Sequence, residues 1–255
     1  IGRLPEDVIP SLYNSLSAGV PPGNVFDFLE TANKLAVGGA TDLGTAVDGL
    51  TTVVNAFGSD IISVGEASDI IFTAVKGGKT TVEELSNAMF NVAPIAASMG
   101  IAFGDVTAAT ATLTAAGTPT SVAMTQIRAA LSELAKPTSQ ISKLFTELTG
   151  QSFEEFIAGG GNMKEGFDII KAGAEAQNKP LAQFVGSVEA LGAIQTLTGK
   201  GSEKFAAELE AAGNAAGATE AAFTQGASGI GLVLDKIRAA INVFVIEIGQ
   251  KLAPV

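Results

Sequence analysis

The chain has 255 residues, of which 47% are hydrophobic but only 6% aromatic, so we expect one large or two ordinary domains with a core of small side chains. Its net charge of −11 argues against nucleic acid as a ligand, because phosphate binding needs clustered Lys and Arg and the 15 basic residues are scattered. The absence of His and Cys excludes imidazole and thiol catalysis, Cys-based zinc sites and disulfides. We therefore expect no cofactor.

The two ends of the sequence indicate a piece of a longer protein. The chain begins with Ile1 rather than Met, and a helical pattern still runs at its last residues. Residues 2–11 carry charges and prolines where a signal peptide needs an apolar core. The segment from Gly229 onward is interrupted by charged residues and falls short of the roughly 20 apolar residues of a membrane span.

Apolar residues recur at helical spacing along most of the chain, in steps of three and four. In chain order, the clearest stripes are Leu43, Val47, Leu50, Val54 and Phe57; Val82, Leu85, Met89, Val92, Ala96 and Met99; and Met124, Ile127, Leu131 and Leu134. Each stripe predicts one buried helix face. No alternating strand of useful length is visible, so the sequence predicts an all-α fold.

Helix starts and stops divide the chain into short segments. Three capping boxes, in which a Ser or Thr is followed three residues later by Glu, predict helix starts at Ser63, Thr80 and Ser152. Glycines mark the expected stops, because they tolerate the left-handed conformation that ends a helix: Gly19, Gly38, Gly58, Gly77, Gly100, Gly117 and Gly150. This punctuation predicts successive short helices that form αα-hairpins in a compact helical domain.

Two stretches look like boundaries. The GGGN sequence at residues 159–162 predicts a flexible loop. Residues 200–226 are rich in Ala, Gly and Glu with few large apolar side chains, and we expect a linker or exposed helix there. The predicted organisation is a helical core domain over residues 1–199, this linker over 200–226, and the start of an amphipathic helical segment over 227–255.

Two patterns suggest chemistry but have simpler structural explanations. The GGKT sequence at residues 77–80 resembles the end of a phosphate-binding loop, but Thr73 stands where that motif needs its first Gly, and no strand precedes it. A helix stop followed by a helix cap explains it better. Paired acids occur at Glu6 and Asp7, at Glu83 and Glu84, and at Glu154 and Glu155. Each pair falls in a first helical turn, where negative charge suits the helix dipole.

The C-terminal segment carries the candidate interaction site. An apolar stripe runs through Ile230, Leu234, Ile237, Ile241, Phe244, Ile248 and Leu252, with further apolar residues beside it. Such a surface can pack on the chain's own core, form a helical bundle between copies, or insert at a membrane interface. We favour a bundle between copies, because Ile residues at heptad-like spacing suit oligomers. A homo-trimer or homo-hexamer is expected.

Four ordered segments resemble the core region of phage tail tape measure proteins. They are LSAGVPP at Leu16 to Pro22, DFLETANKLAVGGATD at Asp27 to Asp42, VAPIAASMGIAFGDV at Val92 to Val106, and LTAAGTPTSVAMTQIRAAL at Leu113 to Leu131. The similarity is specific from about Leu4 to Pro137, weaker to about Leu197, and loose again in the VFVIEIGQKLAP segment.

The resemblance implies a virion component of a phage or prophage-derived tail. Members of such families are helical multimers in the lumen of the tail tube, where they help to set tail length, nucleate tube assembly at the distal end, and leave during DNA ejection. The implied partners are the tail tube protein, distal tail or baseplate proteins and tail assembly chaperones, with assembly in the host bacterial cytoplasm. Glycines break the helices of this stretch every few turns, so we expect it to organise one end of the ruler.

The resemblance leaves one alternative from another class. The stripe from Ile230 to Leu252 is also compatible with a membrane-active helix, with membrane contact during ejection. Its near balance of acidic and basic residues is a poor match for the basic face of interfacial helices. An enzyme is the weakest reading, given the missing His and Cys, and we expect no catalytic site.

Overall fold

The computed structural model describes residues 5–226, which form α-helices and two short 3-10 helices and contain no strand. The all-α prediction is confirmed. The helices are α1 (Pro5–Ser17), α2 (Val25–Gly38), α3 (Leu43–Phe57), α4 (Val64–Gly77), α5 (Val82–Ala88), η1 (Met89–Asn91), α6 (Ala93–Ser98), α7 (Phe103–Ala115), α8 (Thr120–Leu134), α9 (Gln140–Thr149), α10 (Phe153–Ala158), α11 (Met163–Ala176), η2 (Leu181–Gln183), α12 (Val188–Thr198), α13 (Ser202–Gly213) and α14 (Ala218–Gly226).

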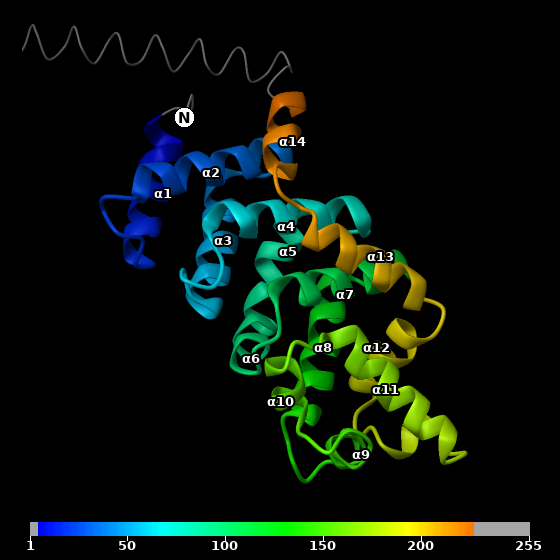
Figure 1. Cartoon of the computed structure of the whole chain (residues 1–255). Helices are drawn as coiled ribbons and strands as arrows, with labels where there is room; N and C mark the ends of the chain where they lie inside the picture. Colours follow the sequence, from blue (N-terminus) through cyan, green and yellow to red (C-terminus); the bar gives the residue numbers. More distant parts are fainter. Residues whose placement is uncertain (1–4, 227–255) are drawn as a thin grey trace, which may run out of the picture.

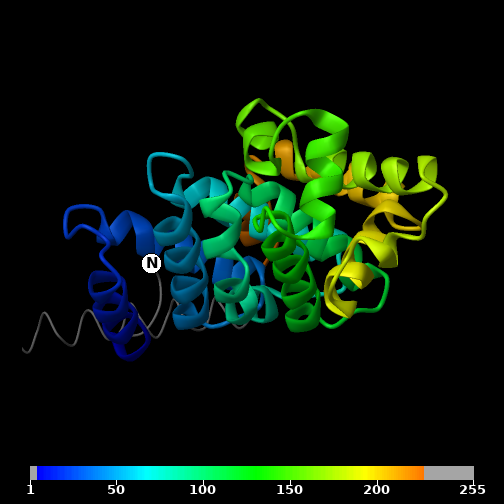
Figure 2. The same ribbon diagram turned by 90° about the horizontal axis from the view of Figure 1, so that it is seen from below.

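The helices form an elongated body with α1 to α3 at one end and α9 to α11 at the other (Figure 1). Figure 2, viewed from below, again places α1 at the extreme end of the body. The chain then turns back: α13 packs on α7 and α4, and α14 packs on α2 and α4. Helices far apart in sequence therefore close the middle of the molecule.

The centre of the fold is α7, which packs against α4, α8, α12 and α13 and is buried on nearly all sides. Its sequence is mostly Ala and Thr, and the threonine hydroxyls need partners when buried. Thr110 and Thr112 donate to the carbonyls of Val106 and Ala108 at 2.8 Å, so each hydroxyl is satisfied within its own helix. Small side chains with internal hydrogen bonds thus let four helices approach one another closely.

The predicted stripes are buried, with one difference in how they are built. Leu43, Val47, Leu50 and Phe57 lie in the core, as do the stripes from Val82 to Met99 and from Met124 to Leu134. Val54 of the first stripe is only half-buried, and its neighbour Val53 lies in the core instead. The sequence from 82 to 99 does not form one continuous helix, however. It divides into α5, η1 and α6, and Pro94 lies in the first turn of α6. Proline has no amide hydrogen and its ring clashes with the preceding turn, which explains the break.

Two of the three predicted helix starts are confirmed. Ser63 accepts the amide of Glu66 at 3.1 Å, and Ser152 forms a full capping box with Glu155. The third start was misplaced by one residue, because Thr81 and not Thr80 caps α5. A second full box, Asn162 with Glu165, went unrecognised because its first residue is Asn. Residues 159–162, expected as a flexible loop, form a hydrogen-bonded turn that ends in this cap.

The predicted glycine stops are of two kinds. Five of them adopt positive φ, Gly150 among them with a left-handed value of 75°. Gly38 and Gly77 do not have positive φ and are instead points of close helix approach. A Cβ at Gly38 would lie 2.8 Å from the Cβ of Ala222, and one at Gly77 would overlap the carboxylate of Glu208. These two glycines let α14 and α13 pack closely.

Residues 200–226, expected as a linker or an exposed helix, form two helices, α13 and α14, that pack on the body. Phe205 on α13 is fully buried, and Glu208 is almost so. Lys34 on α2 pairs with Glu220 on α14 at 2.9 Å, which links the two helices at the surface. Alanine and glycine offer little apolar area, but they allow the close contacts at Gly38 and Gly77 and leave room for one large anchor, Phe205. The stretch therefore belongs to the compact body.

Candidate interaction surface

The predicted stripe lies in residues 227–255, outside the part of the chain that the structure describes. Its seven residues, Ile230, Leu234, Ile237, Ile241, Phe244, Ile248 and Leu252, therefore stay a prediction. Within residues 5–226, no helix is both long and apolar enough to cross a membrane.

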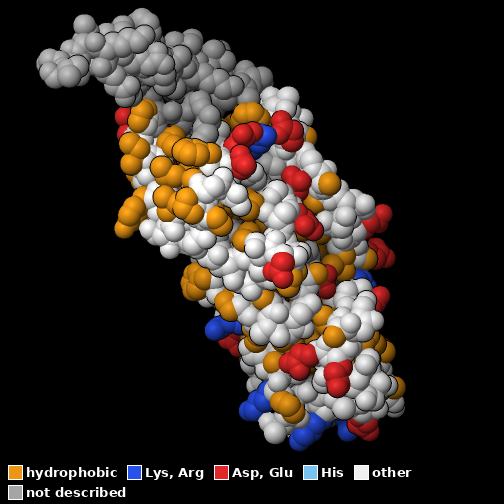
Figure 3. Space-filling model, turned by 60° about the vertical axis from the view of Figure 1, so that its left-hand side comes forward, with side chains coloured by type: hydrophobic (Ala, Val, Ile, Leu, Met, Phe, Trp, Pro, Cys, Tyr) orange, Lys and Arg blue, Asp and Glu red, His pale blue; other side chains and the backbone are white. Residues whose placement is uncertain are grey.

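The most prominent surface feature of the described residues is α1. Its exposed side carries Ile9, Tyr13 and Leu16, which are 63%, 71% and 40% exposed. These residues are spaced four and three apart and so share one helix face; we name them the outer face of α1. Figure 3 shows hydrophobic side chains gathered at this end of the molecule. An exposed apolar face of this kind is typical of an interaction site.

The opposite side of α1 explains why its apolar face points outward. Ser11 and Ser15 are buried, and α1 packs against α3 and α2. Their hydroxyls donate to the carbonyls of Asp7 and Ser11 at 3.0 and 2.7 Å, so neither is left unsatisfied. The end of the helix is held by Asn55, whose amide donates to the carbonyl of Ala18 at 2.9 Å. The orientation of α1 is thus fixed by these two serines together with Val8 and Leu12, which pack against the core.

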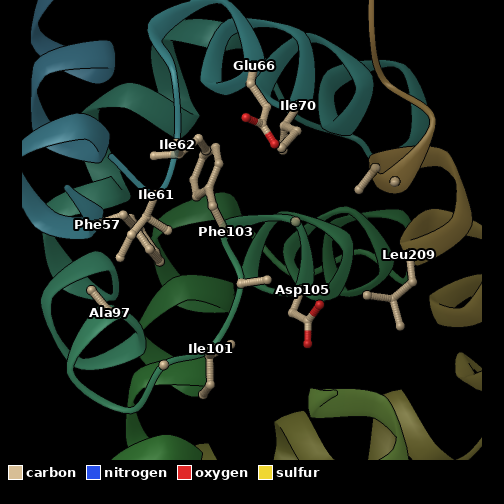
Figure 4. A pocket seen from close by; sticks show the side chains of 15 residues that line it. Phe57, Ile61, Ile62, Glu66, Ile70, Ala97, Ile101, Phe103, Asp105 and Leu209 are labelled. Carbon is tan, nitrogen blue, oxygen red and sulfur yellow. The ribbon is translucent and has the colours of Figure 1, made fainter. Parts of the chain in front are cut away.

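A hollow of about 410 Å³ opens between α4, the start of α7 and α13. Its walls are mainly apolar and include Phe57, Phe103 and Leu209. Figure 4 shows two carboxylates on opposite sides, Glu66 from α4 and Asp105 from α7, with Asp105 directed away from Glu66. The two groups therefore do not converge on a common point, as a general acid and base would.

Asp105 has a structural task instead. It is buried, and its carboxylate accepts the amide of Met163 at 2.7 Å, at the first turn of α11. Burial raises the pKa of Asp105, the Met163 amide lowers it in part, and the nearby charge of Glu165 raises it further. The net direction is upward because removing a carboxylate from water outweighs one hydrogen bond.

Two other carboxylates hold later helices in the same way. Asp69 on α4 accepts the amides of Gly217 and Thr219 at 2.8 Å, at the start of α14. Glu133 on α8 accepts the amides of Gly186 and Ser187 at 2.8 Å, at the start of α12. Sequence analysis missed these contacts, since the partners are roughly 50 to 150 positions apart and no local pattern marks them. Part of the acidic character of the chain therefore serves helix capping.

The GGKT sequence is also structural. The amide of Lys79 donates to the hydroxyl of Thr114 at 3.2 Å, and Thr80 shares a hydrogen-bonded cluster with Thr120 and Glu84. Gly78 lies against Ala111 of α7, which leaves no cradle for a phosphate. No group of three or more acidic residues that could hold a metal ion occurs within residues 5–226.

Comparison with known proteins supplies the family. The model of the family described as phage-related minor tail protein matches residues 5–196, which is most of the chain. The chain belongs to the phage-related minor tail protein family. The matched residues include the four segments that resemble tape measure proteins.

Two curated relatives of the chain carry tape measure names, which confirms the resemblance to tape measure proteins. The chain is 31% identical over 252 residues to the "Probable tape measure protein" of Clostridium phage phiCD119, an alignment that covers 95% of this chain and 27% of the relative. It is 26% identical over 223 residues to the "Tape measure protein" of Pneumococcus phage Dp-1, covering 84% of this chain and 19% of the relative. The chain thus spans about a quarter or less of these relatives. No solved structure matches it.

Proposed function

We propose that this chain is a structural, non-catalytic section of a tape measure protein. The observation that carries the proposal is the similarity to two tape measure proteins over most of the chain. The described residues fit a structural role, because their carboxylates at Asp69, Asp105 and Glu133 cap helices. The acidic composition also suits a protein beside DNA, since it gives a polyanion no basic patch to bind.

In the full tape measure protein, the proposed place of this section is the lumen of the tail tube or the tail tip. There the protein helps to set tail length and to nucleate the tube at its distal end, and it is released during DNA ejection. Its proposed partners are the tail tube protein, distal tail or baseplate proteins and tail assembly chaperones. These roles follow from the family and are testable in the phage or prophage that encodes the chain.

The short helices support an organising role for this section over that of a linear ruler. Among residues 5–226 the longest helices, α3 and α8, have 15 residues and so measure about 22 Å. Roughly 220 residues in one continuous helix would instead span ~330 Å. If residues 5–226 stay compact, they add little to the length of the tail. If they extend on assembly, they add up to the length of one continuous helix.

Deletion of residues 5–226 within the full-length protein separates these roles. Electron microscopy of the resulting particles should show tails absent or rarely initiated, because one end of the tape measure is missing. Tails that are ~330 Å shorter would identify the section as an extended part of the ruler. Normal tails at normal frequency would contradict a tape measure role for this section. An equal deletion elsewhere in the protein serves as the control.

We also propose that copies of the chain associate through the stripe from Ile230 to Leu252, as a trimer or hexamer. Ile237→Asp with Ile241→Asp should reduce the mass measured by light scattering to that of a monomer, because buried unpaired charges cost several kcal/mol. The matched control is Val188→Asp, at an 82% exposed position on α12, which should leave the mass unchanged. An unchanged oligomer in the double variant would refute the interface.

A further inference from the structure

The outer face of α1 has no partner among the described residues. Ile9, Tyr13 and Leu16 expose 40 to 71% of their surface, while serines occupy the buried side of the same helix. Removing large apolar side chains from water is favourable, so covering this face would stabilise the protein. The question is which segment covers it.

The chain leaves the described region at a point from which its remaining residues can reach this face. Gly226, the last residue of α14, lies beside Val37 near the end of α2. The other end of α2 adjoins α1, and the 14 residues of α2 measure about 20 Å (Figure 1). Roughly 30 further residues follow Gly226, and even as a helix they would reach ~45 Å. Residues 227–255 can therefore span the distance to α1.

The sequence of residues 227–255 also contains a second set of apolar residues besides the main stripe. At about 100° per residue, the stripe from Ile230 to Leu252 occupies one side of a helical projection. A second, narrower set lies roughly opposite, and we name it the second face: Leu232, Ala239, Val243 and Ile246. A helix that is apolar on two sides needs two packing partners. An interface between copies would satisfy only one of them.

We propose that the second face of residues 227–255 packs on the outer face of α1 in the same chain. A tethered segment of this length experiences an effective concentration in the millimolar range, which favours its own chain over a neighbour. The stripe through Ile237 and Ile241 then points outward, away from the body, and is presented to other copies. This arrangement goes beyond the tape measure role and does not depend on it.

The single tyrosine of the chain reports directly on this contact. Tyr13 lies on the outer face of α1, and the sequence contains no Trp, so intrinsic fluorescence comes from this one residue. In the full chain, acrylamide should quench Tyr13 at least about threefold less than free N-acetyl-tyrosinamide. Val243→Asp with Ile246→Asp should raise quenching about twofold or more, because the charges prevent the second face from packing.

Ile237→Asp with Ile241→Asp is the matched control for that measurement. It places the same charges on the opposite side of the same segment, so quenching of Tyr13 should stay at the wild-type level. Circular dichroism checks that both variants keep their helix content. Quenching that is already high in the wild type, or equal in the two variants, would overturn the assignment of the second face to α1.

Introduced cysteines identify the chain that supplies the contact. Because the protein has no native Cys, the only disulfide that Tyr13→Cys with Val243→Cys can form within one chain joins these two positions. We expect rapid oxidation to a bond within one chain, seen as a monomer on a non-reducing gel and confirmed by peptide mass. The control pair, Val188→Cys with Val243→Cys, should oxidise far more slowly. Bonds only between chains, or no faster than in the control, would contradict the proposal.

Discussion

α1 and α7 each have 13 residues and each bury small hydroxyl side chains, but they stand in opposite surroundings. On α7, Thr110 and Thr112 bond to their own helix and the whole cylinder is enclosed by α4, α8, α12 and α13. On α1, Ser11 and Ser15 bond in the same way, but among residues 5–226 the helix packs mainly on α2 and α3, and the side with Ile9 and Tyr13 is exposed.

The difference teaches that apolar spacing alone does not say which face of a helix is buried. A hydroxyl that bonds to the carbonyl one turn earlier needs no other partner, so a serine or threonine face can enter a tight contact. Both helices bury faces that carry small hydroxyl side chains, serine in α1 and threonine in α7. In α1 this leaves Ile9, Tyr13 and Leu16 available to a partner, whereas in α7 the packing partners are already in place.

The largest expected effect tests the enclosure of α7. Phe205→Ala removes the fully buried anchor of α13 and should lower the free energy of unfolding by about 3–5 kcal/mol. Phe26→Ala is the matched control, since Phe26 is 65% exposed, and should stay within about 0.5 kcal/mol. Urea unfolding followed by circular dichroism measures both. Equal, small effects would mean that residues 200–226 are a linker after all.

A second change tests how tightly α7 is packed. Ala111→Leu inserts a large side chain where Gly78 already lies against the Ala111 backbone, and should destabilise the protein by about 1–3 kcal/mol or more. The same introduction of Leu on α1, Asn14→Leu at an exposed position, should cost less than about 0.5 kcal/mol. Thermal unfolding of the two variants measures the difference. Similar midpoints would show that α7 is loosely packed and would contradict the account.

The carboxylate at the start of α7 gives a pH test. Because burial raises the pKa of Asp105 above 3.8, the cost of its charge is present above the folded pKa and is relieved as the pH falls through it. Asn at this position can still accept the Met163 amide. The wild type should therefore gain stability relative to Asp105→Asn as the pH falls from 7 towards 4.

The exposed cap Asp42 should behave in the opposite way. Hydrogen bonds from Thr45 lower the pKa of Asp42 below 3.8, so its contribution is present above that value and is lost only as the pH falls further. The stability difference between the wild type and Asp42→Asn should thus stay constant from pH 7 to about 4. Urea midpoints of both variants and the wild type across this range test the two predictions. If the stability differences of Asp105→Asn and Asp42→Asn from the wild type changed in the same way with pH, the account would be contradicted.

The smallest expected change in stability lies on α1. Ile9→Ser with Leu16→Ser should lower the free energy of unfolding by no more than about 1–2 kcal/mol, because these residues are 63% and 40% exposed and contribute mainly through the contact with residues 227–255. The same variant should increase acrylamide quenching of Tyr13 if the outer face is covered by residues 227–255. A loss of more than about 2 kcal/mol would show that this face is part of the body's own core.

Much of the fold was predictable because helices impose a period on their sequence. The stripes at Leu43, Val82 and Met124 and the caps at Ser63 and Ser152 are local patterns, and they appear where expected. The packing of α13 was missed, because its Ala and Gly residues look like a linker until a close neighbour is known. The orientation of α1 was missed for a related reason, since buried serines resemble surface residues.

The candidate site was less predictable than the fold. The contacts of Asp69 with α14 and of Glu133 with α12 depend on tertiary structure, and no spacing in the sequence predicts them. The outer face of α1 is visible in the sequence only as ordinary helical amphipathicity, which normally marks a core. Its exposure could be recognised only once Ser11 and Ser15 were placed on the buried side.

Cryo-electron microscopy of tails from the phage or prophage that encodes this chain tests the central claim most directly. The account predicts that the compact helical body of residues 5–226, with α7 at its centre, is found at one end of the tail tube and in several copies. A virion that lacks the protein, or density in which these residues form one extended helix along the tube, would contradict it.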